Sequence, residues 1–240
     1  MESCIVIIPT YNEIENIHSI IEAVLNQGMQ FSVLIVDDNS PDGTGKVVKV
    51  LQDKDGRIHL IQRSGKLGLG TAYIAGFQYG LEYGFDFIFE MDADFSHNPN
   101  DLNRLLNTCK NGADISVGSR YVKGGNIRNW SKDRLALSFA ASLYVRAVTW
   151  LPVKDPTAGF ICYKRKVLES LEFAKIKFVG YTFQIEMKYY AWSKGFLIKE
   201  VPITFVDRVK GNSKMHANIV SEAIKGVLKM RWRKITGYYY

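Results

Sequence analysis

The segments Cys4-Ile-Val-Ile-Ile8 and Val33-Leu-Ile-Val36 decide the fold of this chain. Each is a short run rich in valine and isoleucine that ends in a polar turn, a pattern typical of strands buried in a parallel sheet. Between them, apolar residues recur at helical spacing from Ile14 to Leu25. The chain therefore opens with a strand, a helix and a second strand.

The alternation continues, with a helix predicted over residues 69–83 and strands over residues 58–62, 85–90 and 114–117. This order predicts an α/β fold, a Rossmann-like, doubly wound, mostly parallel sheet with flanking helices. Ligands of such sheets bind beyond the carboxyl ends of the strands. The residues to examine are therefore those that follow each strand: 9–13, 37–44 and 92–97.

The second half is less regular. Residues 134–151 form an apolar helix that suits either the core or a membrane surface, and residues 183–192 form another helix. Residues 197–205 read as a strand interrupted by Pro202, which is typical of an edge or a bulge. From Ile219 an amphipathic pattern runs into Lys229-Met-Arg-Trp-Arg-Lys234, which predicts a C-terminal amphipathic helical tail.

Composition narrows the class of protein. The 240 residues are 47% hydrophobic and 23% charged, which is typical of a globular chain. The longest stretch without a charge, residues 67–81, is shorter than the roughly 20 apolar residues that a membrane span needs. Three scattered cysteines (Cys4, Cys109 and Cys162) and no visible signal peptide favour a reducing compartment.

The net charge of +7 lies almost entirely in the C-terminal region. Residues 207–240 hold eight basic and two acidic side chains, a balance of +6. Such a basic arm predicts a local anionic partner, with a solvated basic helix as the alternative. Because aromatic-interleaved basic patches on a sheet face are missing, a membrane surface is favoured and nucleic acid is not.

Two carboxylates, Asp92 and Asp94, follow the apolar run Phe87-Ile-Phe-Glu-Met91 with one residue between them. Unpaired, they would repel each other by about 4 kcal/mol at an effective dielectric near 20. A divalent cation removes this repulsion, and Mg²⁺ is commonly held by one or two carboxylates together with substrate phosphates. The pair therefore predicts a site for Mg²⁺ or Mn²⁺.

A second acidic pair, Asp37 and Asp38, ends the second strand. Ser40 resembles a helix N-cap with Pro41 at the first helical position. The carboxylates could accept hydrogen bonds from ribose hydroxyls or a base edge, and a purely structural turn is the alternative. Walker A spacing is absent, and Tyr73 stands where the dinucleotide fingerprint beginning at Gly68 needs glycine, which disfavours a nicotinamide oxidoreductase.

Several motifs, taken in chain order, resemble one known family. In the first half they are Pro9-Thr-Tyr-Asn-Glu13, Val36-Asp-Asp-Asn-Ser-Pro-Asp-Gly-Thr44, Lys66-Leu-Gly-Leu-Gly-Thr-Ala-Tyr73, Met91-Asp-Ala-Asp-Phe-Ser-His97 and Gly118-Ser-Arg-Tyr121. In the second half they are Asp155-Pro-Thr-Ala-Gly-Phe160, Phe183-Gln-Ile-Glu-Met187, Val201-Pro-Ile203, Phe205-Val-Asp-Arg208 and Gly211-Asn-Ser-Lys214. The ordered set resembles the dolichol-phosphate (polyprenol-phosphate) mannose synthase group of inverting GT-A glycosyltransferases, in glycosyltransferase family 2.

The resemblance implies a role for each matching residue. Nucleotide-sugar binding falls to Pro9, Tyr11, Glu13, Val36, Asp38, Asp92, Ala93, Asp94, Arg120, Arg208 and Lys214. The acceptor phosphate would contact Arg120, Arg134 and Ser138, of which the last two are four residues apart on one helix face. Asp92 and Asp94 would hold the metal, and the catalytic set would be Asp94, Arg120 and Arg208.

The implied reaction moves mannose from GDP-mannose to a polyprenyl (dolichyl or undecaprenyl) phosphate with inversion. A phosphate monoester has a second pKa near 6, so the acceptor is largely dianionic at pH 7 and needs no general base. The difficulty is to bring two anionic molecules together, and the cation with Arg120, Arg134, Arg208 and Lys214 would offset their repulsion. Asp207 is expected to be an ion-pair or structural partner.

The resemblance also implies a domain plan. Residues 1–206 form a single GT-A catalytic domain, with a nucleotide-sugar half at 1–120 and an acceptor half at 121–206. Residues 207–240 form a basic tail that closes the site and contacts the membrane. The enzyme is expected to be cytoplasmic and peripherally associated with the cytoplasmic face of a membrane. The 134–151 helix and the tail are the segments expected to contact the membrane. A separate membrane-anchoring subunit is an open alternative for attachment.

Two other functions stay open at the level of sequence. The first is transfer from UDP-glucose or another nucleotide sugar to a polyprenyl phosphate or to a sugar hydroxyl. The second is a non-catalytic nucleotide-sugar binding subunit, against which the intact Asp92, Asp94 and Arg208 argue. Two positions depart from the family pattern: Asn39 stands where many members have glycine, and Ser96 stands where some have a third metal ligand.

Overall fold

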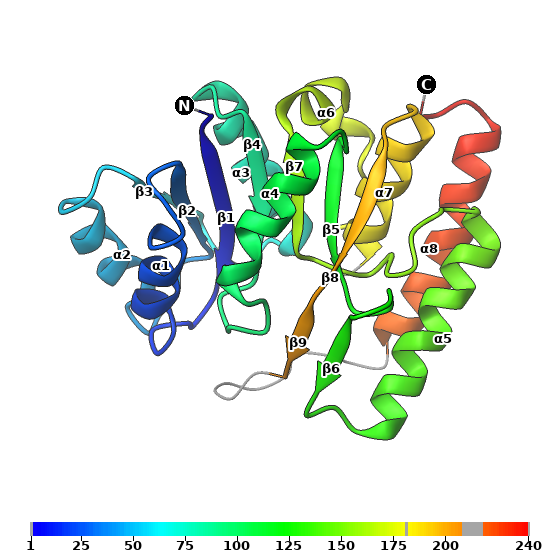
Figure 1. Cartoon of the computed structure of the whole chain (residues 1–240), viewed down its shortest axis with the longest axis horizontal. Coiled ribbons are helices and arrows are strands. Elements are labelled where there is room, and N and C mark those ends of the chain that lie inside the picture. Colours follow the sequence, from blue (N-terminus) through cyan, green and yellow to red (C-terminus); the bar gives the residue numbers. More distant parts are fainter. Residues whose placement is uncertain (1, 181, 208–217, 240) are drawn as a thin grey trace.

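A computed structural model describes residues 2–180, 182–207 and 218–239 of the chain. Its centre is a seven-stranded sheet in the order β3-β2-β1-β4-β7-β5-β8 (Figure 1). The strands are β1 (Cys4–Thr10), β2 (Phe31–Asp37), β3 (Ile58–Gln62), β4 (Phe87–Glu90), β5 (Ile115–Ser119), β7 (Ile161–Lys164) and β8 (Ile198–Pro202). All neighbours pair in parallel except β7, which runs antiparallel between β4 and β5. The predicted mostly parallel sheet is confirmed.

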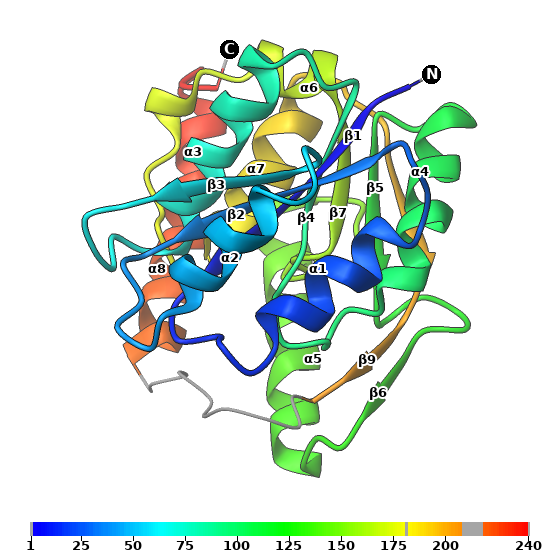
Figure 2. The ribbon, with the colours of Figure 1, turned by 90° about the vertical axis from the view of Figure 1, so that its left-hand side faces the viewer.

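Helices cover both faces of the sheet (Figure 2). The first face carries α1 (Ile17–Leu25), α2 (Thr44–Gln52) and α4 (Leu102–Lys110). The second carries α3 (Leu69–Glu82), α5 (Lys132–Thr149), α6 (Arg165–Ser170), α7 (Thr182–Ser193) and α8 (Asn218–Ile235). Two short 3₁₀ turns, η1 (Pro99–Asp101) and η2 (Phe173–Lys175), complete the helical elements of the described residues.

The core follows from the two-residue period of the strands. In β1, Ile5 and Ile7 pack under α3, whereas Cys4, Val6 and Ile8 pack under α1 and α4. All five are fully buried. A strand that is apolar on both sides needs helices on both sides, which explains why the continuous apolar runs of the sequence form a doubly covered sheet.

A small second sheet lies at the carboxyl edge of the main one. It pairs β6 (Asn126–Arg128) in parallel with β9 (Thr204–Val206), at the lower edge of Figure 1. The strand predicted over 197–205 is therefore two strands in different sheets. Pro202 ends β8, and the amide of Ile203 still donates to the carbonyl of Ser119 before the chain enters β9.

The helix predicted to begin at Pro41 begins at Thr44, and Ser40 is not its cap. Gly43, with φ of +93°, is the residue before the helix. Ser40 instead donates through Oγ to Asp37 Oδ1 at 2.6 Å, so its hydroxyl serves the acidic turn. The capping pattern was wrong because Ser40 Oγ accepts the amide of Asn12 at 3.0 Å and not an amide of the helix.

The apolar helix α5 is mostly exposed, so its composition does not reflect a place in the core. Ser131 caps its first turn, and Trp150 ends it with φ of +61°. Leu137, Phe139 and Trp150 are each about half exposed or more. Helix α8 packs beside α5, and Tyr144 donates to the carbonyl of Ile224 at 3.1 Å (Figure 1). Across the described residues, no helix combines the length and the apolar character needed to cross a membrane.

One buried carboxylate anchors α8 to the rest of the fold. Glu186 of α7 is fully buried and accepts hydrogen bonds from Arg233 Nη1 and Tyr239 Oη, each at 3.0 Å. The same carboxylate also accepts the backbone amides of Lys177 and Phe178. Burial raises the pKa of Glu186, which these donors partly offset. Three separate segments therefore meet at one side chain.

We predict that Glu186→Gln lowers the free energy of unfolding by about 3 kcal/mol, because the mostly buried Arg233 keeps its charge without an opposing one. Chemical unfolding curves measure this change. The matched control is Glu169→Gln, which removes one end of an ion pair whose Glu169 side chain is about half exposed. Such a pair contributes about 1 kcal/mol or less, so equal losses in the two variants would contradict the anchoring role.

Candidate active site

The predicted site residues gather at one edge of the sheet, where β1, β2 and β4 end. Pro9 lies within β1, and Tyr11 and Glu13 follow it, all three partly exposed. Lys66 Nζ lies 4.8 Å from the centre of the Tyr11 ring, a cation–π distance. The amide of Glu13 donates to Thr44 Oγ1 at 3.1 Å, which ties the end of β1 to the start of α2.

The acidic pair after β2 divides into two roles. Asp37 is buried and accepts hydrogen bonds from Thr10 Oγ1 at 2.8 Å and from Ser40, so it joins the ends of β1 and β2. Asp38 accepts from Arg63 Nε at 2.5 Å. Asn39 adopts φ of +56°, the left-handed region that favours glycine and that asparagine enters more readily than most residues.

Arg63 is a site residue that the sequence reasoning missed. Its guanidinium pairs with Asp38 and also donates to Thr71 Oγ1 at 2.7 Å and to the carbonyl of Gly68 at 3.3 Å. It therefore links the end of β2 to the first turn of α3. The side chain of Val36, by contrast, is fully buried in the core, so only its backbone is left to contact a nucleotide.

The third predicted element is the turn after β4. Asp92 and Asp94 are both partly exposed, while Ala93 between them is buried. The amide of Ser96 donates to Asp94 Oδ1 at 3.0 Å, which shapes the turn. The hydroxyl-bearing side chain of Ser96 is buried.

His97 supports the backbone of this turn, a role that the sequence did not predict. Its Nδ1 accepts the amide of Asp92 at 3.2 Å, and its ring stacks on Phe160 with 5.0 Å between the ring centres. Burial lowers the pKa of His97, and an Nδ1 that accepts a hydrogen bond requires the neutral ring with its proton on Nε2. A neutral histidine therefore holds the backbone of the first aspartate.

The two carboxylates fit a hard divalent cation. Oxygen ligands from one or two carboxylates, completed by waters and substrate phosphates, are the donor set that Mg²⁺ prefers. In the described part of the chain, no group of three or more His, Cys, Asp or Glu side chains is arranged to hold a metal. Within the described ranges, the carboxylates that this turn offers to a cation are Asp92 and Asp94.

Arg120 lies just past β5 and is held by a buried ion pair. Its Nε and Nη2 donate to the two oxygens of Asp155 at 2.7 and 2.6 Å, and Nη2 also donates to Thr157 Oγ1 at 2.8 Å. Asp155 is fully buried. Burial lowers the pKa of Arg120, but the hydrogen bonds and charge of Asp155 outweigh it, so the guanidinium stays charged.

The loop that carries Asp155 is itself fixed. The carboxylate of Glu200 on β8 accepts the amides of Lys154 and Asp155 at 2.8 and 3.0 Å. The buried Lys188 of α7 donates to the carbonyl of Ala158 at 2.7 Å. Burial lowers the pKa of Lys188, and the charge of Glu90 at the end of β4 opposes this effect.

Arg134 and Ser138 lie on one face of α5, as predicted. Arg134 Nη1 donates to Asp207 Oδ2 at 2.7 Å, which confirms Asp207 as an ion-pair partner. Tyr121, next to Arg120, donates through its hydroxyl to Ser138 Oγ at 2.7 Å. The structure thereby brings Arg120, Arg134 and Ser138 into one cluster. Arg208 and Lys214 lie outside the described residues.

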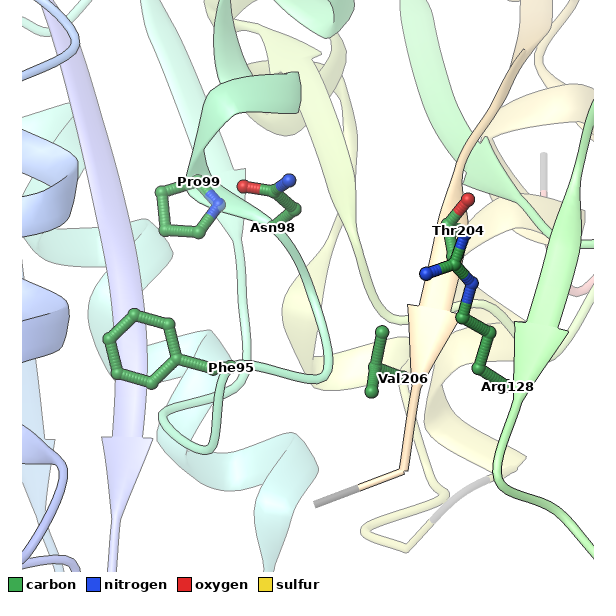
Figure 3. Close-up of a pocket in the computed structure, with 6 residues that line it drawn as sticks. All are labelled: Phe95, Asn98, Pro99, Arg128, Thr204 and Val206. Atoms are coloured by element: carbon green, nitrogen blue, oxygen red, sulfur yellow. The ribbon is translucent and has the colours of Figure 1, made fainter. Parts of the chain in front are cut away.

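A cavity of about 380 Å³ opens beside the acidic turn (Figure 3). It lies between the loop after β4 and the β6–β9 ribbon, and it is lined by Phe95, Asn98, Pro99, Arg128, Thr204 and Val206. The amide of Val206 donates to the carbonyl of Ser96, so the ribbon is attached directly to the acidic turn. The ribbon therefore connects the carboxylates of β4 to the region of Arg134.

The mostly parallel sheet, with an acidic pair after β4 and arginines beside it, has the architecture of a GT-A-type glycosyltransferase fold. A family model described as glycosyl transferase family 2 matches residues 5–172. The chain belongs to glycosyl transferase family 2, as its motifs predicted.

Two relatives and two solved structures specify the likeness. The chain is 46% identical over 222 residues to the polyprenol monophosphomannose synthase of Mycolicibacterium smegmatis, covering 92% of this chain and 83% of that protein. It is 44% identical over 230 residues to the undecaprenyl-phosphate mannosyltransferase of Micrococcus luteus, covering 94% of each.

Among solved structures, glucosyl-3-phosphoglycerate synthase from Mycobacterium tuberculosis, in complex with phosphoglyceric acid, superposes with a TM-score of 0.67 at 18% identity. The match covers 97% of this chain and 80% of that one. The mannosyltransferase PcManGT from Pyrobaculum calidifontis, in complex with GDP-Man and Mn²⁺, gives 0.55 at 13% identity and covers 98% and 74%. Both confirm the fold.

We predict different stability losses for the two carboxylates that hold the arginines. Asp155→Asn should lower the free energy of unfolding by about 3–5 kcal/mol, because Arg120 remains charged and buried without its partner. Asp207→Asn should cost about 1 kcal/mol or less, because both side chains of that pair are part-exposed. Thermal or urea unfolding of the two variants tests the contrast, and a larger loss for Asp207→Asn would reverse it.

Proposed function

We propose that this chain transfers mannose from GDP-mannose to a polyprenyl phosphate, with inversion at the sugar carbon that is attacked. The proposal is supported by one combination: a partly exposed aspartate pair and an arginine cluster at one sheet edge, on a chain 46% identical to a polyprenol monophosphomannose synthase. A single displacement of the diphosphate by a phosphate oxygen inverts the sugar carbon.

On the donor side, Pro9, Tyr11, Glu13 and Asp38 surround the place for the nucleotide. The hydrogen bond from Arg63 holds the carboxylate of Asp38 in place. Asp92 and Asp94, with the backbone of Ala93, would hold Mg²⁺ or Mn²⁺ against the diphosphate. When bound, the cation neutralises charge on the departing nucleoside diphosphate. The likeness to a mannosyltransferase solved with GDP-Man and Mn²⁺ agrees with this choice.

On the acceptor side, Arg120, Arg134 and Ser138 would bind the phosphate of the lipid. At neutral pH that phosphate is largely dianionic and already nucleophilic, so no protein base is required. The two arginines lower the repulsion between the phosphate and the diphosphate of the donor. Arg208 and Lys214 would contact the donor phosphates, a prediction from the motifs alone.

The transfer assay uses the purified chain with GDP-mannose or UDP-glucose, Mg²⁺ or Mn²⁺, and a polyprenyl phosphate. We expect a mannosyl-lipid product with GDP-mannose and its disappearance with EDTA. Asp94→Asn should reduce kcat/KM at least about 100-fold, because the diphosphate loses part of its charge compensation. Asp53→Asn, on the exposed end of α2, is the matched control. Full activity in chelator would contradict the role of the cation.

The same enzyme is proposed to act as a peripheral protein on the cytoplasmic face of a membrane, where its lipid acceptor lies. Helices α5 and α8 lie side by side and expose Leu135, Leu137, Phe139, Leu143, Trp150, Ile224, Leu228, Trp232 and Ile235. On α8 these recur at every third or fourth residue, with exposed Lys225 and Lys229 next to them. An apolar face bordered by lysine and tryptophan suits an interfacial helix.

We predict that a double substitution, Leu228→Glu with Trp232→Glu, reduces co-sedimentation with anionic vesicles at least about fivefold, since it places two charges where apolar groups would enter the interface. Met29→Glu is the control, because Met29 is 73% exposed but lies in the loop before β2. Circular dichroism confirms that the helices persist. Unchanged vesicle binding of the double variant would exclude α8 as the contact surface.

A further inference from the structure

Trp130 lies between the two arginines of the acceptor cluster. It stands just before the N-cap of α5, two residues after β6. The guanidinium carbon of Arg134 is 4.1 Å from its ring centre, and that of Arg120 is 5.5 Å away. Both distances are within the range of cation–π attraction. The two charged groups therefore cannot be further apart than the sum of these distances.

The two arginines reach this ring from different parts of the fold. Arg120 follows β5, whereas Arg134 is in the first turn of α5. Each has its own carboxylate, Asp155 for Arg120 and Asp207 for Arg134, and these belong to two further segments. Two like charges held near each other repel, so each needs a fixed support. The aromatic ring is the element that the two share.

The surroundings of Trp130 are not those of a core residue. It belongs to neither hydrophobic cluster of the described structure and is only partly buried. Its aromatic neighbour is Phe205 of β9, in an edge-to-face contact with 5.5 Å between the ring centres. Its Nε1–H is buried without a hydrogen-bond partner among the described residues. Two guanidinium groups and the ring of Phe205 are thus neighbours of the indole.

We propose that Trp130 is a positioning residue that holds Arg120 and Arg134 as a two-arginine clamp for a phosphate monoester dianion. The inference rests on the proposed function in naming the acceptor phosphate as the ligand. The ring face attracts both guanidinium groups and limits their rotation. The two groups therefore keep a fixed orientation relative to each other before the phosphate binds. The role predicts an effect on the acceptor and not on the nucleotide sugar.

Two substitutions of Trp130 distinguish the contribution of the ring face from that of the indole N–H. Trp130→Phe keeps an aromatic face and removes the N–H, whereas Trp130→Leu keeps bulk and removes both. We expect Trp130→Leu to raise the KM for a short-chain prenyl phosphate about tenfold, with the KM for GDP-mannose unchanged. Trp130→Phe should stay within about threefold of wild type.

The matched control is Trp192→Leu. Trp192 is also a partly buried tryptophan under a cation, with Lys234 Nζ 3.6 Å from its ring, but it lies at the end of α7, away from the arginine cluster. This variant should leave both KM values unchanged. Equal increases in the KM for donor and acceptor in Trp130→Leu would indicate a general structural role and overturn the proposal.

Calorimetric binding of phenyl phosphate supplies a readout that needs no transfer. Trp130→Leu should bind it about tenfold more weakly than the wild type, and Trp130→Phe should bind it nearly as well. If the wild-type chain transfers no sugar from any donor, the proposed function fails while this measurement still tests the clamp. Wild-type affinity in Trp130→Leu, or an equal loss in Trp130→Phe, would refute the role of the ring face.

Discussion

Burying the guanidinium of Arg120 is costly unless a carboxylate is buried with it, and Asp155 meets that requirement. The pair joins the end of β5 to the loop that precedes β7. Because β7 runs antiparallel between β4 and β5, this loop begins the one central strand that enters the sheet from the carboxyl edge. The ion pair thus fixes Arg120, and with it the cluster of Arg120, Arg134 and Ser138, relative to the acidic turn that follows β4.

The supports around this pair are layered. Glu200 and Lys188 hold the backbone of the loop, and His97 holds the backbone of the acidic turn. Arg120 and Arg134 are each already paired with a carboxylate of the protein, Asp155 and Asp207 respectively. Under the proposed function, a phosphate that entered the site would meet charges that are fixed in place, so little reorganisation would be needed when the nucleoside diphosphate departs.

Much of this arrangement follows from local patterns. The strand ends, the acidic pair and the helix that carries Arg134 and Ser138 could be predicted because periodicity and turn chemistry are local properties. The helix start after Asp38 was wrong, since Ser40 binds Asp37 instead of capping the helix. The interruption at Pro202 was predicted, but strand β7 and the passage of β9 into a second sheet were missed, because their pairing depends on contacts far along the chain.

The sequence by itself determined the family, the doubly wound sheet and the identity of the residues at the strand ends. Only the tertiary structure decided which charged groups share an environment: Arg63 with Asp38, Asp155 with Arg120, and Trp130 between two arginines. The physical reason is that the partners are separated along the chain. These partners lie between 4 and 35 residues apart, and no periodic pattern connects them. Burial then makes their pairing obligatory, because an isolated buried charge is unstable.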